Sequence, residues 1–405
     1  MQQTPRLALC TLMLGIFSCT FDRGGVPPKF RDTPTPDWTP GTDLRLDRTA
    51  EQTPEAGPDL PPREAGPDPW FDSAWSHRKR ITVGAGLTVA TLTDFPLLVS
   101  WASDADLKTS AQTKGEDLVF VLAGTTQKLA HEIEDYDEKS GRLVAWVRLP
   151  TLPAGVATEI DLYYGNASAA PQQDATQVWI AGYEAVWHLA QEPGAVVDSA
   201  GKHPGSCRGN MDKKDLVTGQ VGKGLDFDGK DDAFDVPALD VVASGGGDDG
   251  LTVEGWVFSR SGSGRLISKA TGLAVDKHYW MLGLSADGSN TIDFRLRTAG
   301  TVVWKQASGF STSSWMHLAA TYDGAMMRVF KDGQKVLETA CTGAIDTNSS
   351  TPTSVGDQPG GSRPLDGILD EVRVSTRARG EAWIQAQFAN QSDPGAHLTI
   401  GPQEP

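Results

Sequence analysis

Short strand-like runs recur along the chain from about residue 70 onward, and they constrain its fold more than any other feature. The runs are rich in β-branched and aromatic residues, and Gly, Asp or Pro separates them. The chain also holds 44 Gly, 25 Pro and 12 Trp, which favours many turns and aromatic strands. The runs lie at residues 79–83, 95–101, 118–121, 143–149 and 159–164, and then at 225–227, 251–258, 279–284, 292–296, 315–322, 327–331 and 371–374. This pattern predicts an all-β fold made of two β-sandwich domains.

The length of the chain allows more than one hydrophobic core. It has 405 residues, of which 39% are hydrophobic, so two or three domains are expected. The sequence divides into a signal segment at residues 1–19, a tether at 20–69, a first β-sandwich at 70–180 and a second, larger sandwich at 183–402. One helix is expected at residues 381–391, where Ile384 and Phe388 share a face that would pack on a sheet.

The charge of the chain excludes some classes of partner. Its formal net charge is −16, and its longest basic stretch is the four residues 77–80. An acidic surface repels polyphosphate and anionic lipid, so a nucleic-acid binder or a polybasic membrane-surface protein is not expected.

The first residues have the features of an export signal. Arg6 precedes an apolar run at residues 7–17, which is too short to span a bilayer. The sequence Ile-Phe-Ser-Cys at residues 16–19 resembles a bacterial lipobox, which implies that Cys19 is lipidated and anchors the protein in a membrane. Thr20 after the cysteine favours the outer membrane by resemblance to known sorting rules, and hence the cell surface. The alternative is an ordinary secretory signal.

Residues 20–69 have the composition of a disordered tether. They contain 11 of the 25 prolines and few aromatic residues. Such a segment buries too little apolar area to offset the entropy of ordering, and proline extends it toward polyproline II. If fully extended at about 3.1 Å per residue, it would reach on the order of 150 Å.

Six motifs in the first sandwich occur in the order found in a known domain family. They lie at residues 75–81, 94–99, 115–120, 131–134, 144–147 and 162–166. Together they resemble the bacterial domain of unknown function DUF2341. The resemblance implies a secreted or surface protein and supplies no catalytic residue.

The second sandwich resembles the laminin G-like, concanavalin A-like jelly-roll family. The motifs that carry the resemblance lie at residues 183–189, 198–201, 227–232, 252–257, 315–324 and 365–374. Members of this fold class mostly bind carbohydrates, proteins or lipids, and some relatives are glycosidases or lyases. The resemblance also implies a structural Ca²⁺, for which Asp198 and Asp370 are the expected ligands and Asp228 a third. The alternative is that these are turn carboxylates.

The cysteines allow one disulfide within the second sandwich. Cys10 lies in the signal segment and Cys19 at the lipid site, which leaves Cys207 and Cys341. In an oxidising compartment these two are expected to pair, although two buried free thiols are the alternative.

Catalytic motifs give little support to an enzyme. Glu132 and Glu134 could face one side of a strand as a glycosidase pair, but a solvated strand end is the simpler interpretation. His188 and His317 lie in apolar runs and are expected to be core or edge histidines. Trp280 and Trp304 could stack on sugar rings if their strands present them outward, and burial is the alternative.

These observations favour a noncatalytic surface lipoprotein that binds an extracellular glycan or protein through the second sandwich. Two alternatives stay open: a carbohydrate-active enzyme with unrecognised carboxylates, and a structural component of the cell envelope. We assign no catalytic residues, and the ligand-binding residues stay unknown at this stage.

Overall fold

The computed structural model describes residues 68–241, 249–285, 287 and 289–405. The described residues belong to one compact unit, Ala65–Pro405. They form a mainly β structure with antiparallel sheets, as the strand-like runs predict. None of the helices in the described ranges is long and apolar enough to cross a bilayer.

The first sandwich consists of a four-stranded sheet, in the order β23-β1-β6-β3, and a three-stranded sheet, β2-β5-β4. Its hydrophobic side chains alternate along the strands, so that Ile160 and Leu162 of β6 face Leu97 and Val147 in one core. The elements are β1 (His77–Val83), β2 (Leu92–Trp101), α1 (Ala105–Ser110), β3 (Val119–Leu122), β4 (His131–Asp137), β5 (Arg142–Leu152), β6 (Thr158–Tyr164) and α2 (Ala175–Val178).

The second sandwich consists of two eight-stranded sheets. One has the order β10-β11-β22-β13-β18-β19-β20, with β7 also paired to β22, and the other has the order β17-β16-β15-β14-β21-β12-β9-β8. The elements are β7 (Tyr183–Trp187), β8 (Ala195–Val196), β9 (Gly205–Arg208), β10 (Leu216–Thr218), β11 (Lys223–Asp228), β12 (Ala233–Val236), β13 (Asp249–Ser259), β14 (Gly264–Ala270), η1 (Val275–Lys277), β15 (His278–Leu284), β16 (Thr291–Thr298), β17 (Thr301–Ser308), β18 (Trp315–Tyr322), β19 (Met326–Lys331), β20 (Gln334–Ala340), β21 (Thr353–Val355) and β22 (Asp366–Arg377).

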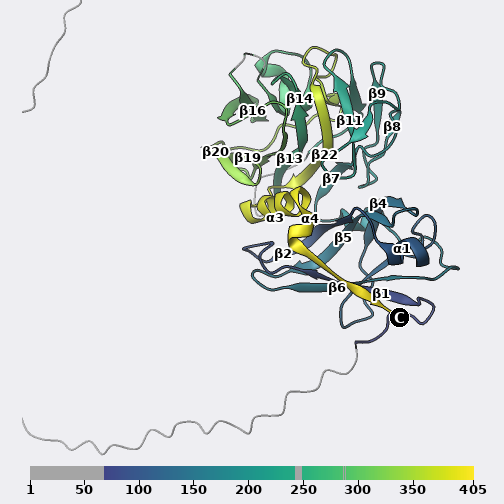
Figure 1. The fold of residues 1–405 in the computed structure, drawn as a ribbon. Helices are drawn as coiled ribbons and strands as arrows, with labels where there is room; N and C mark the ends of the chain where they lie inside the picture. The colour runs from purple at the N-terminus through teal and green to yellow at the C-terminus, as the bar shows by residue number, and fades with distance from the viewer. Residues whose placement is uncertain (1–67, 242–248, 286, 288) are drawn as a thin grey trace, which may run out of the picture. The chain divides into compact units, whose positions relative to one another are not determined.

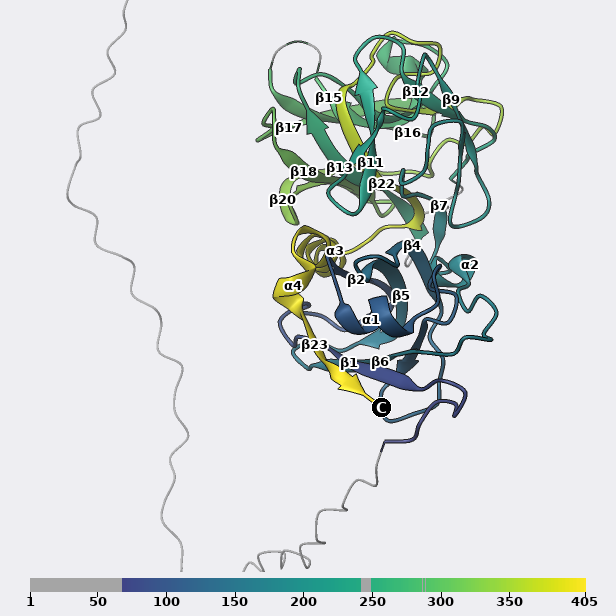
Figure 2. The same cartoon turned by 45° about the vertical axis from the view of Figure 1, so that its right-hand side comes forward.

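Helix α3 (Glu381–Ser392) confirms the predicted helix and lies between the two sandwiches (Figures 1 and 2). Trp383 and Ile384 belong to the core of the first sandwich, where Trp383 packs against Phe95 with ring centroids 5.2 Å apart. Phe388 stacks on Trp256 of β13 in the second sandwich, with centroids 5.7 Å apart. The helix is therefore apolar on two sides, because it packs on a sheet of each sandwich.

The last strand returns to the first sandwich. After the short helix α4 (Pro394–His397), β23 (Leu398–Glu404) pairs antiparallel with β1, so the chain ends beside its first described strand (Figure 1). The sequence-based boundary placed residues up to 402 in the second sandwich, whereas the structure places β23 in the sheet of the first. The reason is that β1 has one side open beside β6, and β23 fills it.

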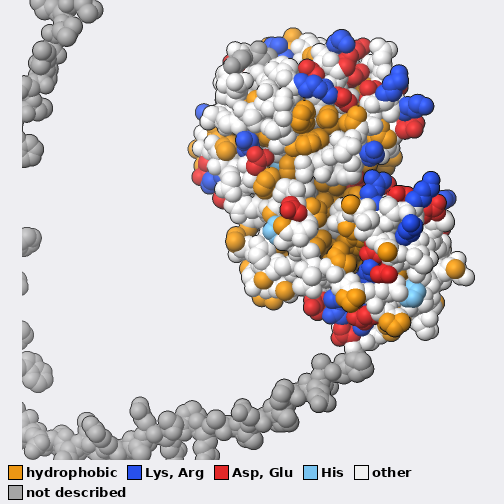
Figure 3. All heavy atoms as spheres, viewed as in Figure 1, with side chains coloured by type: hydrophobic (Ala, Val, Ile, Leu, Met, Phe, Trp, Pro, Cys, Tyr) orange, Lys and Arg blue, Asp and Glu red, His pale blue; other side chains and the backbone are white. Residues whose placement is uncertain are grey.

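The surface carries both signs of charge. On the face seen in Figure 3, Lys and Arg side chains are interspersed with Asp and Glu.

Candidate functional site

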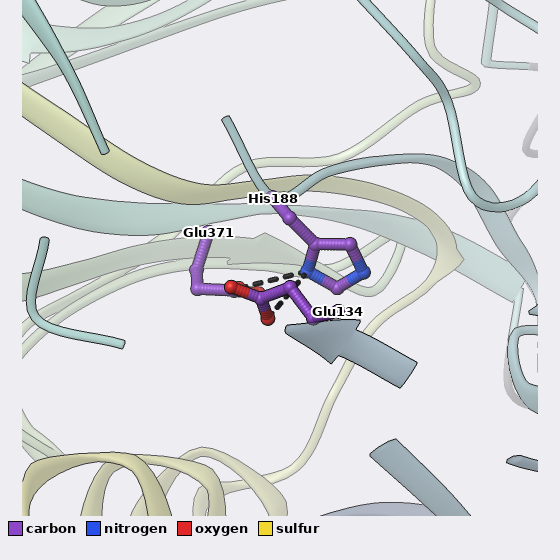
Figure 4. Close-up of side chains that lie close together, drawn as sticks. All are labelled: Glu134, His188 and Glu371. Carbon is purple, nitrogen blue, oxygen red and sulfur yellow. Dashed lines mark hydrogen bonds and ion pairs between the residues drawn. The ribbon is translucent and has the colours of Figure 1, made fainter. Parts of the chain in front are cut away.

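A histidine and two glutamates from three separated segments meet in the protein interior. His188 directly follows β7, Glu134 lies on β4 and Glu371 lies on β22. Nδ1 of His188 is 2.8 Å from Oε1 of Glu371 and 3.6 Å from Oε2 of Glu134 (Figure 4). The three side chains are at most 6% exposed. We call Glu134, His188 and Glu371 the junction cluster, because the first sandwich supplies Glu134 and the second supplies the other two.

Two β-bulges direct the glutamates into this space. The register of β22 against β13 shifts so that Glu371 and Val372 together oppose Gly255. Glu371 also has a left-handed backbone, with φ of 54°, which is unusual for a residue with a side chain. The register of β4 against β5 shifts in the same way around Glu134. Because a bulge breaks the alternation of a strand, it re-aims side chains that would otherwise face elsewhere.

A second carboxylate from the first sandwich supports the histidine from its other side. Glu132 Oε2 lies 3.2 Å from Nε2 of His188. The same carboxylate accepts hydrogen bonds from Nε1 of Trp179 at 2.7 Å and from Oγ of Ser199 at 2.6 Å. These contacts fix the position of Glu132 and the orientation of the imidazole ring.

The two glutamates of the junction cluster have their own supports. Trp146 Nε1 donates to Oε2 of Glu134 at 2.9 Å. Arg373, two residues after Glu371 on the same strand, donates to Oε2 of Glu371. The guanidinium of Arg373 also lies over the ring of Trp146, 4.4 Å from its centroid. The cluster is therefore held by charged and aromatic groups from both sandwiches.

The burial of so many ionisable groups shifts their pKa values. Burial disfavours the charged form of His188, but the charges of Glu371 and Glu132 outweigh it and raise the pKa of His188 well above its ordinary value. Burial likewise opposes ionisation of Glu132, yet the charge of His188 and the hydrogen bonds to Glu132 lower its pKa to about 2. Burial raises the pKa of Glu134 well above its ordinary value, and the nearby Glu371 carboxylate adds to the rise.

Two carboxylate oxygens near the cluster have no hydrogen-bond partner. Oε1 of Glu134 and Oδ1 of Asp370 are both buried and unpaired. Oδ2 of Asp370 accepts from the amide of Val221 at 2.7 Å. Burial raises the pKa of Asp370 well above its ordinary value, and the charges of Glu371 and Glu134 raise it further. Unpaired buried oxygens of this kind are costly unless a cation or a proton occupies the space beside them.

A second candidate site lies on the outer face of one sheet of the jelly roll. Trp304 of β17 is 40% exposed, and the guanidinium of Arg295 lies over its ring, 4.6 Å from the centroid. In the same sheet, the guanidinium of Arg297 on β16 lies 5.3 Å from the ring centroid of Tyr279 on β15. We call Tyr279, Arg295, Arg297 and Trp304 the aromatic–arginine patch.

The alternation of β16 explains why this patch faces outward. Ile292, Phe294 and Leu296 are fully buried in the core of the jelly roll. Arg295 and Arg297 occupy the intervening positions, so their side chains lie on the opposite face. Arg295 pairs across the strands with Trp304 in the register of β16 and β17.

The structure separates the residues predicted to bind calcium. Both oxygens of Asp198 accept backbone amides, from residues 186, 200, 202 and 203, which is a turn-stabilising role. Asp370 lies beside the junction cluster, and Asp228 lies in an exposed turn with Asp231 and Asp232. Within the described residues, Asp228–Asp231–Asp232 and the junction cluster are the two groups of three or more His, Cys, Asp or Glu side chains close enough to share a metal ion.

The predicted disulfide is not formed, which corrects that prediction. Cys207 and Cys341 are both free. Cys207 lies on β9, near the β8 end of one sheet, whereas Cys341 follows β20, the edge strand of the other sheet, which contacts β17 at the opposite end. The two residues thus sit at opposite ends of the jelly roll, beyond the reach of a disulfide. Cys19, the predicted lipidation site, lies outside the described residues.

Burial at the junction overturns the solvated-strand interpretation of two other residues. Glu132 and Glu134 are not solvated, because the second sandwich packs against the end of β4 and supplies His188 as their partner. His188 and His317 are buried as expected. Trp280 is 1% exposed and belongs to the core, while Trp304 is exposed. His188 and Glu371 gave a local signal, because each is a polar residue in a largely apolar run, whereas Glu134 lies in the acidic run at residues 132–138 and gave none.

The comparisons with protein families match two parts of the chain. Residues 114–188 match the domain of unknown function DUF2341. Residues 228–385 match a laminin G model described as the concanavalin A-like lectin/glucanases superfamily. No curated protein matches the chain.

Solved structures show only distant likeness. Domain 4 of an extracellular arabinanase from Geobacillus stearothermophilus, solved with arabinotriose, is 16% identical, with a TM-score of 0.38 over 51% of this chain and 98% of that domain. The binding domain of Paraclostridial Mosquitocidal Protein 1 is 13% identical, with a TM-score of 0.39 over 51% of this chain and 52% of that domain. Trypanosoma rangeli sialidase is 14% identical, with a TM-score of 0.37 over 62% of this chain and 41% of the sialidase.

The family matches agree with the two sandwiches and with the order of their motifs along the sequence. The chain therefore carries a DUF2341 domain, matched over residues 114–188, followed by a concanavalin A-like lectin/glucanase domain, matched over residues 228–385.

Proposed function

We propose that this chain is a noncatalytic cell-surface binding protein whose jelly roll holds an extracellular glycan. The observation that carries the proposal is the aromatic–arginine patch, in which Trp304 is 40% exposed on β17 and the guanidinium of Arg295 lies over one face of its ring. The match to a superfamily of lectins and glucanases supports the same class of ligand.

The patch has the chemistry that sugar recognition requires. The face of an indole ring packs on the apolar face of a pyranose, and a large aromatic side chain buries a wide apolar area in doing so. Guanidinium groups donate hydrogen bonds to hydroxyls and bind carboxylates with two parallel hydrogen bonds. Arg297 pairs with Asp346 at 2.9 Å, which holds it at the edge of the patch. The exposed indole of Trp304 is therefore the group that we expect to contact the sugar.

The N-terminal segments supply the display part of this proposal. Lipidation at Cys19, which the resemblance to a lipobox implies, would anchor the chain in a membrane. We propose that this membrane is the outer membrane. The proline-rich segment at residues 20–69 would then hold the folded sandwiches away from the membrane surface. Expression in cells, followed by lipid labelling of the wild type and of Cys19→Ser, tests the anchor directly: labelling that persists in Cys19→Ser would contradict it.

A glycosidase is less well supported than a binding protein. Catalytic carboxylates must reach a sugar in a cleft, but the side chains of Glu132 and Glu134 are 12% and 2% exposed and have protein partners. Hydrolysis of a polysaccharide panel that Glu132→Gln abolishes would reverse this preference.

We also propose that a structural Ca²⁺ binds at the turn that contains Asp228. Asp228 shares a turn with Asp231 and Asp232, and a carboxylate oxygen from each lies within 4.8 Å of the others. Thermal unfolding with Ca²⁺ and with EGTA measures this, since an ion that binds only the native state raises its stability. An unchanged melting temperature removes calcium from the proposal.

A glycan array probed with the full-length chain tests the binding function. We expect binding to a glycan that Trp304→Ala weakens about tenfold or more, the equivalent of about 1.4 kcal/mol. Val336→Ala is the matched control, because Val336 is 39% exposed but lies on β20 of the other sheet. Equal binding by both variants would place the ligand elsewhere. Recovery of one stoichiometric protein partner by crosslinking in cells, without glycan binding, would favour an envelope component instead.

A further inference from the structure

We propose that the junction cluster is a binding site for a divalent transition-metal ion, which Glu134, His188 and Glu371 coordinate between the two sandwiches. This site is distinct from the calcium ligands predicted by resemblance and does not depend on the glycan-binding function. The first support is the donor set, because one imidazole nitrogen with two carboxylates suits ions such as Zn²⁺, Mn²⁺ or Fe²⁺.

The separations of the donor atoms fit a shared ion. Nδ1 of His188 lies 2.8 Å from Oε1 of Glu371 and 3.6 Å from Oε2 of Glu134, and one donor atom from each of the three residues lies within 4.8 Å of the others. Metal–ligand distances of about 2.0–2.2 Å place neighbouring donors roughly 3–3.5 Å apart in tetrahedral or octahedral geometry. Only small movements of the carboxylates are then needed to receive an ion.

The tautomer that metal binding requires is already supported. A metal-bound histidine almost always donates its second ring N–H to a carboxylate, which orients the ring. Glu132 lies 3.2 Å from Nε2 of His188 and can keep the proton on that nitrogen, whereas Nδ1, which lies 2.8 Å from Oε1 of Glu371, would give up its proton when a metal binds. Glu132 is itself fixed by Trp179 and Ser199, which makes it a positioning residue rather than a ligand.

An independent observation points to a cation in the same place. Oε1 of Glu134 has no hydrogen-bond partner, although the side chain of Glu134 is only 2% exposed. The carboxylate is aimed at His188 and Glu371 (Figure 4). Oδ1 of Asp370, on the residue before Glu371, is also buried and unpaired.

The balance of buried charges also favours a cation at the junction cluster. Glu132, Glu134, Glu371 and Asp370 place four carboxyl groups in and around the cluster, and the cationic groups paired with them there are His188 and Arg373. A buried excess of negative charge must be neutralised by protons or by a cation. A divalent ion bound to Nδ1 of His188 would neutralise the carboxylates of Glu134 and Glu371.

The site that results would be structural. The three ligands are at most 6% exposed, so a substrate in solution could not reach the coordination position that they leave on the ion, and a buried water would fill it. Since Glu134 belongs to one sandwich and His188 and Glu371 to the other, the ion would fasten the two together.

Metal titration of the full-length chain tests the proposal. The chain is freed of metal by dialysis against EDTA and titrated with Zn²⁺ while its thermal unfolding is followed, and Co²⁺ serves as a probe with visible absorption. We expect stoichiometric Zn²⁺ uptake, a higher melting temperature and a Co²⁺ spectrum characteristic of nitrogen and oxygen ligands.

Variants assign the metal to its ligands. Glu134→Gln retains the hydrogen bond from Trp146 and should fold, yet we expect it to weaken Zn²⁺ binding by at least 100-fold; His188→Gln should do the same. Glu132→Gln should weaken binding roughly 10- to 100-fold, as expected for a carboxylate behind a ligand. Asp228→Asn is the control and should bind Zn²⁺ like the wild type.

Two outcomes would overturn the proposal. One is a chain that takes up no stoichiometric Zn²⁺ and shows no Zn²⁺-dependent rise in melting temperature, which would mean that protons neutralise the cluster. The other is a rise that persists in Glu134→Gln but is lost in Asp228→Asn, which would place the metal in the exposed turn.

Discussion

The side chain of Asn390 on helix α3 forms two hydrogen bonds with the backbone of Leu98 on β2. Its Oδ1 accepts from the amide of Leu98 at 2.7 Å, and its Nδ2 donates to the carbonyl of Leu98 at 3.0 Å. Because β2 is the edge strand of the sheet β2-β5-β4, Asn390 supplies the partner that a neighbouring strand would otherwise provide.

Asn390→Ala should lower the free energy of unfolding by about 2–4 kcal/mol, since it leaves two buried backbone groups unpaired at about 1–3 kcal/mol each. Urea unfolding measures the change. Ser392→Ala, at an exposed position of the same helix, should change stability by less than about 0.5 kcal/mol. A loss below about 1 kcal/mol in Asn390→Ala would show that water or a shifted strand satisfies Leu98.

Trp383 and Trp304 form a contrasting pair for core and surface. Trp383→Ala should cost about 3–5 kcal/mol, because it removes a ring that packs on Phe95 in the core of the first sandwich. Trp304→Ala should leave unfolding nearly unchanged, since Trp304 is 40% exposed. Similar costs for the two variants would mean that Trp304 has a structural role, and would weaken the assignment of the patch to ligand binding.

Buried His131 should make the fold sensitive to acid. Burial lowers its pKa from about 6.5 to about 4. The unfolded chain therefore binds a proton below about pH 6.5, while the folded chain does not until about pH 4. The free energy of unfolding should consequently fall as the pH decreases through this window, by up to about 3 kcal/mol from this residue.

Urea unfolding at several pH values checks the contribution of His131. In His131→Gln the dependence of stability on pH between about 4 and 6.5 should decrease by about one proton, or about 1.4 kcal/mol per pH unit. An unchanged dependence would assign the acid sensitivity to other groups.

The two free cysteines should differ in reactivity. Cys341 is 6% exposed and should react with an alkylating reagent only after unfolding, whereas half-buried Cys207 should react slowly in the native state. Burial also raises the pKa of Cys207, which reduces its thiolate fraction. Mass spectrometry of the alkylated peptides measures both rates. If neither cysteine is alkylated until a reductant is added, the two cysteines form a disulfide after all.

The strands were predictable because their signals are local. The runs at residues 143–149 and 251–258 carry their own alternation and turn punctuation, and they form β5 and β13. The helix at residues 381–391 was predictable for the same reason. Strand β23 was not, because Gly401 and Pro402 weaken its local pattern and its partner β1 lies more than 300 residues earlier.

The junction cluster could not be predicted for a different reason. Glu134, His188 and Glu371 come together only when the two sandwiches pack and two bulges re-aim the glutamates. Periodicity within one strand placed Glu132 and Glu134 on the same side but said nothing of what covers them. The exposure of Trp304, in contrast, followed once the register of β16 and β17 was known.

Because β23 pairs with β1, the jelly roll is an insertion in the sequence of the first sandwich. Both the N-terminal and the C-terminal end of the jelly roll continue into strands of the first sandwich. The chain leaves through the segment before β7 and comes back through α3. A force on a ligand held by the jelly roll would thus be shared between two covalent connections. The second connection leads into β23, which pairs with β1, the first described strand of the chain. Such a force would load the hydrogen bonds between β1 and β23 in shear, all at the same time, and would not separate the two sandwiches one contact after another.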